Sequence, residues 1–196
     1  MDKQKHQYQT LPSQTIVICW ALIQSLGWGM IYLLITHLDN RMPDAFILAF
    51  IGLFSGGVMG VLQHTLIARG ANIQLQHWTL FTALGLAIGL GSLAFIEFWD
   101  GSPYLFLLPV FLIPSALQWL SIRHHTQSGW LWIIANSIAS MIFVMFMTSI
   151  GDQGYDFLSA VIPALLQGIA SGFVIIWLLR QLPKSKSVSQ KRYIEV

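Results

Sequence analysis

Six long apolar blocks dominate this sequence and leave few folds open to it. They cover residues 14–37, 45–68, 78–99, 103–122, 130–150 and 157–180. Each block is close to or above the ~20 residues that a helix needs to cross a hydrocarbon core of about 30 Å. Because lipid offers no water to satisfy backbone groups, we expect every block to be a helix. Charged residues make up only 9% of the chain, so the sequence predicts an all-α membrane protein with six transmembrane helices.

The connections between blocks are short, which predicts a single six-helix transmembrane domain over residues 14–180. A polar tail precedes it at 1–13, and a basic tail follows at 181–196. If the N-terminus is cytoplasmic, that side collects nearly all basic residues: Lys3, Lys5, Arg69, Arg123, Arg180, Lys184, Lys186, Lys191 and Arg192. The opposite side then holds only Arg41. The positive-inside rule therefore predicts cytoplasmic termini in a bacterial inner (plasma) membrane.

An internal repeat links the odd and even helices. One tryptophan in each odd block sets the alignment: Trp20, Trp78 and Trp130. At five, seven and nine residues beyond each of them, the chain holds only Gly, Ala or Ser. One glutamine recurs in each even block: Gln63, Gln118 and Gln167. This pattern predicts three parallel helix pairs of about 50–58 residues, related by a pseudo-threefold axis along the membrane normal.

Small residues recur every four positions within several blocks, which places them on one helix face. The residues expected to pack helices together are Gly52, Gly56, Gly60, Gly85, Ala87, Gly91, Gly168 and Gly172. Small residues at this spacing let two helix backbones approach closely inside a bilayer. These seams predict helix contacts either within the chain or with a partner.

Several polar side chains lie inside the apolar blocks. The candidates for a ligand site are Gln63, His64, Gln118, Asn136 and Gln167, and the set is completed by Gln24, Thr82 and Ser140. Polar and ionisable residues within a membrane segment favour a functional role, and a histidine such as His64 could hold a pigment. The same residues could equally form interhelical hydrogen bonds, with His64 at the wet interface. Both interpretations stay open, and the sequence does not identify a cofactor.

Catalytic and metal-binding motifs are missing from the sequence, which has no H-E-x-x-H, G-x-S-x-G or Walker pattern. The middle of each block also lacks Asp and Glu, which coupled carriers often keep there. The nearest carboxylate is Glu97, expected at the outer rim. The sequence therefore predicts a protein that is not an enzyme and has no metal site.

A run of small residues, glutamine and arginine, followed by tryptophan and further small residues, resembles a group of uncharacterised multi-pass bacterial membrane proteins. The resemblance rests on residues 56–60, Gln63, Arg69, Trp78, Gly85 and Gly89. It implies no activity to carry over. The size, the six helices and the cytoplasmic ends also resemble the substrate-binding membrane subunits of energy-coupling vitamin importers, which lack a threefold hairpin repeat.

Two functions follow as expectations. The first is a structural or interaction subunit of a membrane complex, whose glycine seams pack helices within itself, against a membrane-protein partner or against a second copy. The alternative is a small-ligand binding or permeation unit, such as the substrate-binding subunit of an importer, or a pigment-binding protein. The net charge of +2 resides in the tails and loops, so the lipid bilayer is the expected partner and nucleic acid is not.

Overall fold

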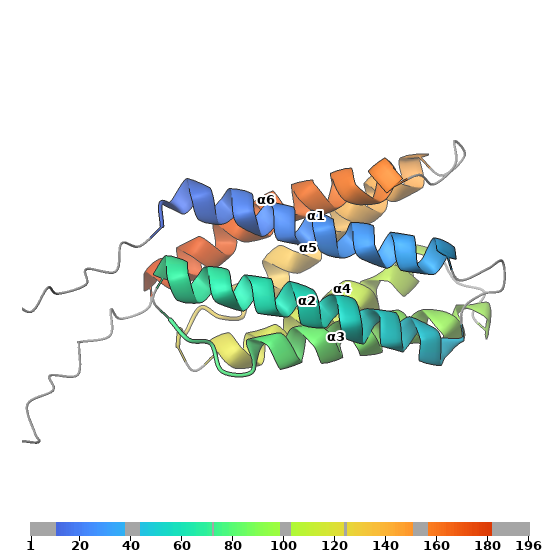
Figure 1. Cartoon of the computed structure of the whole chain (residues 1–196), viewed down its shortest axis with the longest axis horizontal. Coiled ribbons are helices and arrows are strands. Elements are labelled where there is room, and N and C mark those ends of the chain that lie inside the picture. Colours follow the sequence, from blue (N-terminus) through green and yellow to red (C-terminus); the bar gives the residue numbers. More distant parts are fainter. Residues whose placement is uncertain are drawn as a thin grey trace, which may run out of the picture.

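The computed structural model describes residues 11–37, 44–71, 73–98, 103–123, 125–150 and 157–181. Within these ranges the chain is all-helical, with six α-helices, one short 3₁₀-helix and no strand. The elements are α1 (Ser13–His37), α2 (Ala45–Ala71), α3 (Trp78–Ser92), η1 (Leu93–Phe98), α4 (Pro103–Ile122), α5 (Leu131–Ile150) and α6 (Phe157–Gln181) (Figure 1). The six apolar blocks therefore form the six helices.

The third block departs from the single helix predicted over 78–99, because α3 ends at Ser92 and the chain continues as η1. Two glycines, Gly89 and Gly91, weaken the helix there. The Ser92 hydroxyl also donates to the Gly89 carbonyl at 2.6 Å. A side-chain hydrogen bond of this kind competes with the regular backbone pattern, which accounts for the change to a tighter helix.

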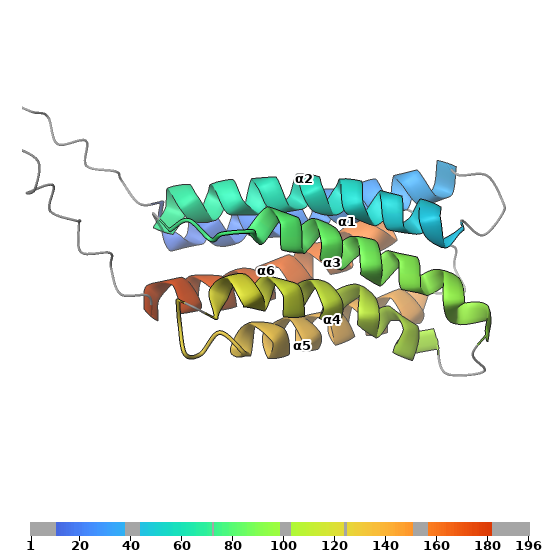
Figure 2. The same ribbon diagram turned by 90° about the horizontal axis from the view of Figure 1, so that it is seen from below.

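The helices form a closed ring, because each packs against its neighbours in the chain and α6 packs against α1. Figure 2 shows α3 between α2 and α4 in this ring. Short connections make successive helices antiparallel, so α1, α3 and α5 run in one direction and the even helices in the other. The start of α1 and the end of α6 consequently lie at the same end of the bundle, drawn on the left in Figure 1 and called the terminal end below.

Four apolar stretches are long enough to cross a membrane: Ser13–His37, Ala45–Gly70, Trp78–Phe95 and Phe157–Gln181. The described parts of α4 and α5 add shorter apolar stretches, Pro109–Ile122 and Leu131–Phe146. These helices are compatible with membrane integration. Much of the predicted orientation rests on residues outside those that the structure describes: Lys3, Lys5, Arg41, Lys184, Lys186, Lys191 and Arg192. The Glu97 side chain also lies outside them.

The outer surface of the bundle is apolar, and several polar side chains are buried inside it. Large apolar side chains such as Phe46, Phe50 and Leu26 are exposed on the outer surface, while Ser55 and Gln63 are completely buried. A soluble monomer rarely exposes a contiguous apolar patch larger than a few hundred Å². The outer surface therefore suits a lipid environment better than water.

The glycines of α2 lie against the backbone of α3. A Cβ atom added to Gly56 would lie 2.8 Å from the Cα of Ala83, and one added to Gly60 would lie 2.8 Å from the Cα of Thr79. Gly52 continues this contact one turn further along and would meet the Cα of Ala87 at 2.8 Å. Any larger residue would push the two helices apart.

The other predicted packing residues also face helices of the same chain. Gly168 on α6 meets the Cα of Ala21 on α1, where an added Cβ would lie 2.6 Å away. Three further contacts join Gly172 to Val17, Gly85 to Pro114 and Gly91 to Ala49. The glycine seams are thus occupied within the ring.

Candidate functional site

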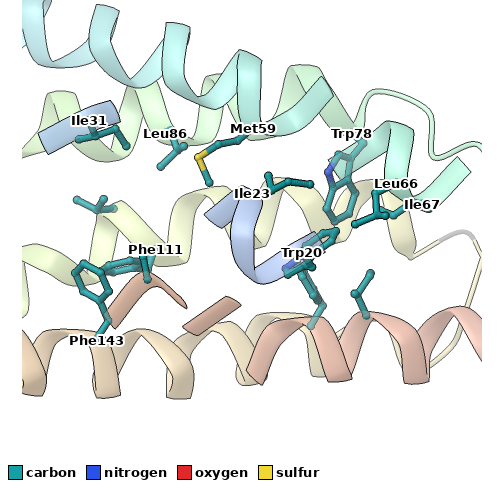
Figure 3. Close-up of a cluster of buried hydrophobic side chains, with 14 of the residues drawn as sticks. Trp20, Ile23, Ile31, Met59, Leu66, Ile67, Trp78, Leu86, Phe111 and Phe143 are labelled. Atoms are coloured by element: carbon teal, nitrogen blue, oxygen red, sulfur yellow. The ribbon is translucent and has the colours of Figure 1, made fainter. Parts of the chain in front are cut away.

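Three tryptophans meet at the centre of the ring, one from each odd helix. Trp20 lies 6.1 Å from Trp78 and 5.8 Å from Trp132, and Trp78 lies 5.8 Å from Trp132, measured between ring centroids. All three side chains are buried, with at most 1% of their surface exposed. Two of them are labelled in Figure 3. This tryptophan triangle closes the middle of the bundle near the terminal end.

The third member of the triangle is not the tryptophan used in the sequence alignment. Trp130 lies in the turn before α5 and is 52% exposed, whereas Trp132 points to the axis. The alignment on small residues predicts Trp130 for this place, and the internal repeat itself stays a prediction. The residue four positions after each central tryptophan is polar and buried: Gln24, Thr82 and Asn136.

Each central indole donates a hydrogen bond to the neighbouring even helix. Trp78 Nε1 donates to Gln63 Oε1, Trp132 Nε1 to Gln118 Oε1 and Trp20 Nε1 to Ser171 Oγ, each at 3.1 Å. The first two acceptors are the glutamines expected to be equivalent. The third indole bonds to Ser171 on α6, and Gln167 lies one turn deeper on the same helix.

A polar cavity of about 40 Å³ lies one helical turn deeper than the tryptophan triangle. Each of the six helices contributes a buried polar side chain to its wall: Gln24, Gln63, Thr82, Gln118, Asn136 and Gln167. Helix α4 contributes a second one, Ser115, whose hydroxyl donates to the Phe111 carbonyl at 2.7 Å. A cavity needs roughly 10–15 Å³ per water molecule, so this one has room for about three. All of these side chains are uncharged amides or hydroxyls, and the cavity therefore favours neutral ligands.

A second aromatic cluster bounds the cavity on the side away from the terminal end. The ring centroids of Trp28, Phe111 and Phe143 lie 5.0–5.2 Å apart. Figure 3 shows Trp20 and Trp78 on one side and Phe111 and Phe143 on the other, with Met59 and Leu86 between them. Trp28, Phe111, Met59 and Leu86 all line the cavity. The polar cavity thus lies between two aromatic layers along the bundle axis.

Hydroxyl groups fix the orientation of two of the amides. The Thr82 hydroxyl donates to its own helix at the Trp78 carbonyl (2.9 Å), so its oxygen can only accept from Gln118 Nε2 (2.9 Å). In the same way the Ser140 hydroxyl donates to the Asn136 carbonyl (2.6 Å) and accepts from Gln167 Nε2 (3.2 Å). The donors of both amides are therefore directed at neighbouring helices.

Among the completely buried side-chain atoms that the structure describes at the cavity, these bonds leave one donor and one acceptor without a partner. Gln63 uses its oxygen for Trp78, so its Nε2 is left over, and Gln167 uses its nitrogen for Ser140, so its Oε1 is left over. An unsatisfied buried polar group costs about 1–3 kcal/mol. Pro114 on α4 has no N–H to donate to the Val110 carbonyl, and both residues line the cavity.

The structure brings four of the five predicted ligand residues together at the cavity: Gln63, Gln118, Asn136 and Gln167. His64 is half-buried and is not part of the cavity wall. It follows Gln63 directly, and one step along a helix turns a side chain by about 100°. Ser55 is also buried without a partner for its hydroxyl, but it lies outside the cavity lining.

The described residues contain no group of three His, Cys, Asp or Glu side chains that could hold a metal ion. No family model, curated protein or solved structure matches this chain. Its function is therefore inferred from the chemistry of the cavity.

Proposed function

We propose that the chain crosses a lipid bilayer six times, as three helix-pair repeats, and binds a small neutral ligand in the central cavity. One observation carries the ligand assignment: every helix supplies an uncharged polar side chain to a central cavity, and its completely buried atoms include one unpaired donor and one unpaired acceptor. Buried polar groups in folded proteins are nearly always satisfied. A ligand that offers both an acceptor and a donor would satisfy Gln63 and Gln167 together.

Membrane crossing is supported by the apolar outer surface and by the positions of three arginines. Arg69, Arg123 and Arg180 follow or end the three even helices at the terminal end. In the proposed orientation this end faces the cytoplasm, in keeping with the positive-inside rule. The resemblance to bacterial multi-pass proteins makes a bacterial inner membrane the proposed location.

The proposed repeat pairs α1 with α2, α3 with α4 and α5 with α6, with Trp132 as the third central tryptophan. Its support is the near-equal spacing of the tryptophan triangle and the polar residue that follows each tryptophan by four positions. The axis would pass through the triangle and the cavity. A ligand site on such an axis draws on all three repeats, as in transporters built from parallel repeats.

Ligand binding is favoured over a purely structural role because the predicted packing seams are occupied inside the ring. Gly56, Gly60 and Gly168 contact helices of the same chain, so they are not open to a partner helix. The cavity, in contrast, contains the side-chain nitrogen of Gln63 and the side-chain oxygen of Gln167, which bond to no neighbouring helix among the described residues.

The cavity size limits the ligand to a few non-hydrogen atoms. Formamide has three, and it carries both a carbonyl acceptor and N–H donors. A ceiling of about 1.5 kcal/mol per non-hydrogen atom limits its dissociation constant to about 0.5 mM at best. A charged ligand is disfavoured because the cavity wall carries no opposite charge.

Formamide titration of the purified full-length protein tests this function through intrinsic tryptophan fluorescence. Gln63 and Gln118 bond directly to Trp78 and Trp132, so a ligand at the cavity should change the emission saturably. N,N-dimethylformamide is larger and has no N–H, and it should produce no saturable change. If formamide also gives no saturable change, or if both compounds act alike, the ligand assignment fails.

A matched pair of glutamine variants tests whether formamide binds at the central cavity. Gln167→Leu removes the unpaired acceptor without touching a tryptophan partner, and it should weaken formamide binding by at least about tenfold, as expected for one buried hydrogen bond. Gln74→Leu, at an exposed position before α3, should leave binding unchanged. Circular dichroism shows whether each variant is folded. The absorption spectrum of the same preparation tests the alternative of a bound pigment.

A further inference from the structure

A groove of about 480 Å³ lies on the outer surface between α1 and α6 at the terminal end. Its floor contains the buried side chain of Val17, and its walls are the exposed side chains of Ile18 (60% exposed) and Phe173 (63% exposed). Trp177 follows Phe173 one turn closer to the end of α6. The groove is therefore apolar along most of its length.

The end of the groove is basic. Arg180 belongs to the last turn of α6, and its Nη2 donates to Ser13 Oγ at 2.6 Å, which holds the guanidinium beside the groove. This is its one hydrogen bond among the residues that the structure describes. A guanidinium has five N–H donors in a planar fork that matches phosphate oxygens. Arg180 is thus positioned to bind an anion while it remains bonded to Ser13.

We propose that this groove binds one anionic phospholipid, with its phosphate at Arg180 and Ser13 and an acyl chain along Ile18 and Phe173. The site has the shape and polarity of an amphiphile: a cation at one end and an apolar channel leading away from it. Trp177 lies at the level between the two, and tryptophan is the residue enriched at membrane–water interfaces. The site rests on the membrane integration proposed above, and it does not depend on the central cavity.

The lipid preference of the full-length protein can be measured by native mass spectrometry. We would titrate phosphatidylglycerol and phosphatidylcholine with identical acyl chains and compare the dissociation constants of the first bound lipid. One basic residue near an anionic headgroup should make phosphatidylglycerol bind about fivefold more tightly than phosphatidylcholine. Wild-type protein should show this preference, and Arg180→Gln should lose it.

Two variants separate a built site from general surface charge. Arg69 is exposed at the end of α2 at the same end of the bundle, and Arg69→Gln should keep the preference. Arg180→Lys preserves the charge and should keep most of it. An unchanged preference in Arg180→Gln, or an equal loss in Arg69→Gln, would overturn the site.

Two further experiments test whether the groove holds the acyl chain and whether the anion at Arg180 belongs to a lipid or is free phosphate. Phe173→Ala should weaken the binding of phosphatidylglycerol and of phosphatidylcholine to the same extent, because it removes acyl-chain contact and leaves the headgroup contact in place. Inorganic phosphate should not displace phosphatidylglycerol, and displacement would mean a site for free anions. Extraction of the chain from membranes by alkaline carbonate would reject membrane integration itself, whereas a carbonate-resistant chain without lipid preference would reject only this site.

Discussion

The indole of Trp78 donates to the side-chain oxygen of Gln63 across the α2–α3 interface at 3.1 Å, and neither side chain has any exposed surface. This bond fixes how the Gln63 amide is turned. With its oxygen committed to Trp78, its nitrogen is the unpaired donor at the central cavity. The packing of the bundle and the chemistry of the cavity are therefore coupled through one side chain.

Removing either partner should destabilise the protein. Trp78→Phe leaves Gln63 Oε1 unsatisfied, and Gln63→Leu does the same to Trp78 Nε1, so each should lower the free energy of unfolding by about 1–3 kcal/mol. The double variant should lose less than the sum, because the interaction is removed only once. Reversible unfolding in mixed micelles measures all three values. Strict additivity would mean that this hydrogen bond is not formed.

Two adjacent glycines of α2 should respond in opposite ways to substitution. Gly56→Leu forces a side chain into the backbone of α3 and should abolish folding or cost at least about 3 kcal/mol of unfolding free energy. Gly57 has no atom of another segment within 4 Å of an added Cβ. Gly57→Ala should therefore stabilise the helix by about 0.5–1 kcal/mol. Equal effects at both positions, measured by thermal unfolding, would contradict the packing of α2 on α3.

The two tryptophans at the start of α5 provide a test of which one belongs to the triangle. Trp132→Phe removes the donor to Gln118 and part of the central packing, and it should lower the unfolding free energy by about 1–3 kcal/mol. Trp130→Phe should change it by less than about 0.5 kcal/mol, as expected at an exposed position. The tryptophan emission of Trp132→Phe should also lose a buried component. The reverse order of effects would restore the alignment on Trp130.

His77 has a left-handed backbone conformation immediately before α3, with φ 62° and ψ 9°. Such a conformation costs a residue with a Cβ about 1–2 kcal/mol, whereas glycine adopts it freely. Relief of this strain in His77→Gly should raise the unfolding free energy by about 1 kcal/mol. The loss of the ring contact between His77 and Phe81 reduces this gain. His77→Val should lower the unfolding free energy.

Gln74→Gly serves as the control for the His77 variants. Gln74 precedes α3 in the same connection, and His77 is the only non-glycine residue with positive φ in the part of the chain that the structure describes. Glycine at position 74 should give no stabilisation. A gain as large as that of His77→Gly would show that backbone strain at His77 is not the cause.

The sequence alone determined the all-helical architecture and the approximate bounds of its six helices. Apolar blocks of this length have few other structures open to them, and their short connections impose an antiparallel order. The residues that approach a neighbouring backbone were also visible, since Gly52, Gly56 and Gly60 lie on one face by spacing alone. The polar residues Gln63, Gln118 and Gln167 were apparent as a group for the same reason.

Only the tertiary structure decided which of two nearby residues faces the axis. It selected Trp132 over Trp130 as a member of the triangle, Ser171 over Gln167 as the partner of Trp20, and Gln63 over His64 at the cavity. Helices that are apolar on nearly every side have no amphipathic phase to set their rotation, and one residue of shift turns a side chain by about 100°. Rotation and axial offset are instead set by the packing of glycines such as Gly168 against neighbouring backbones, and that packing exists only in the assembled ring.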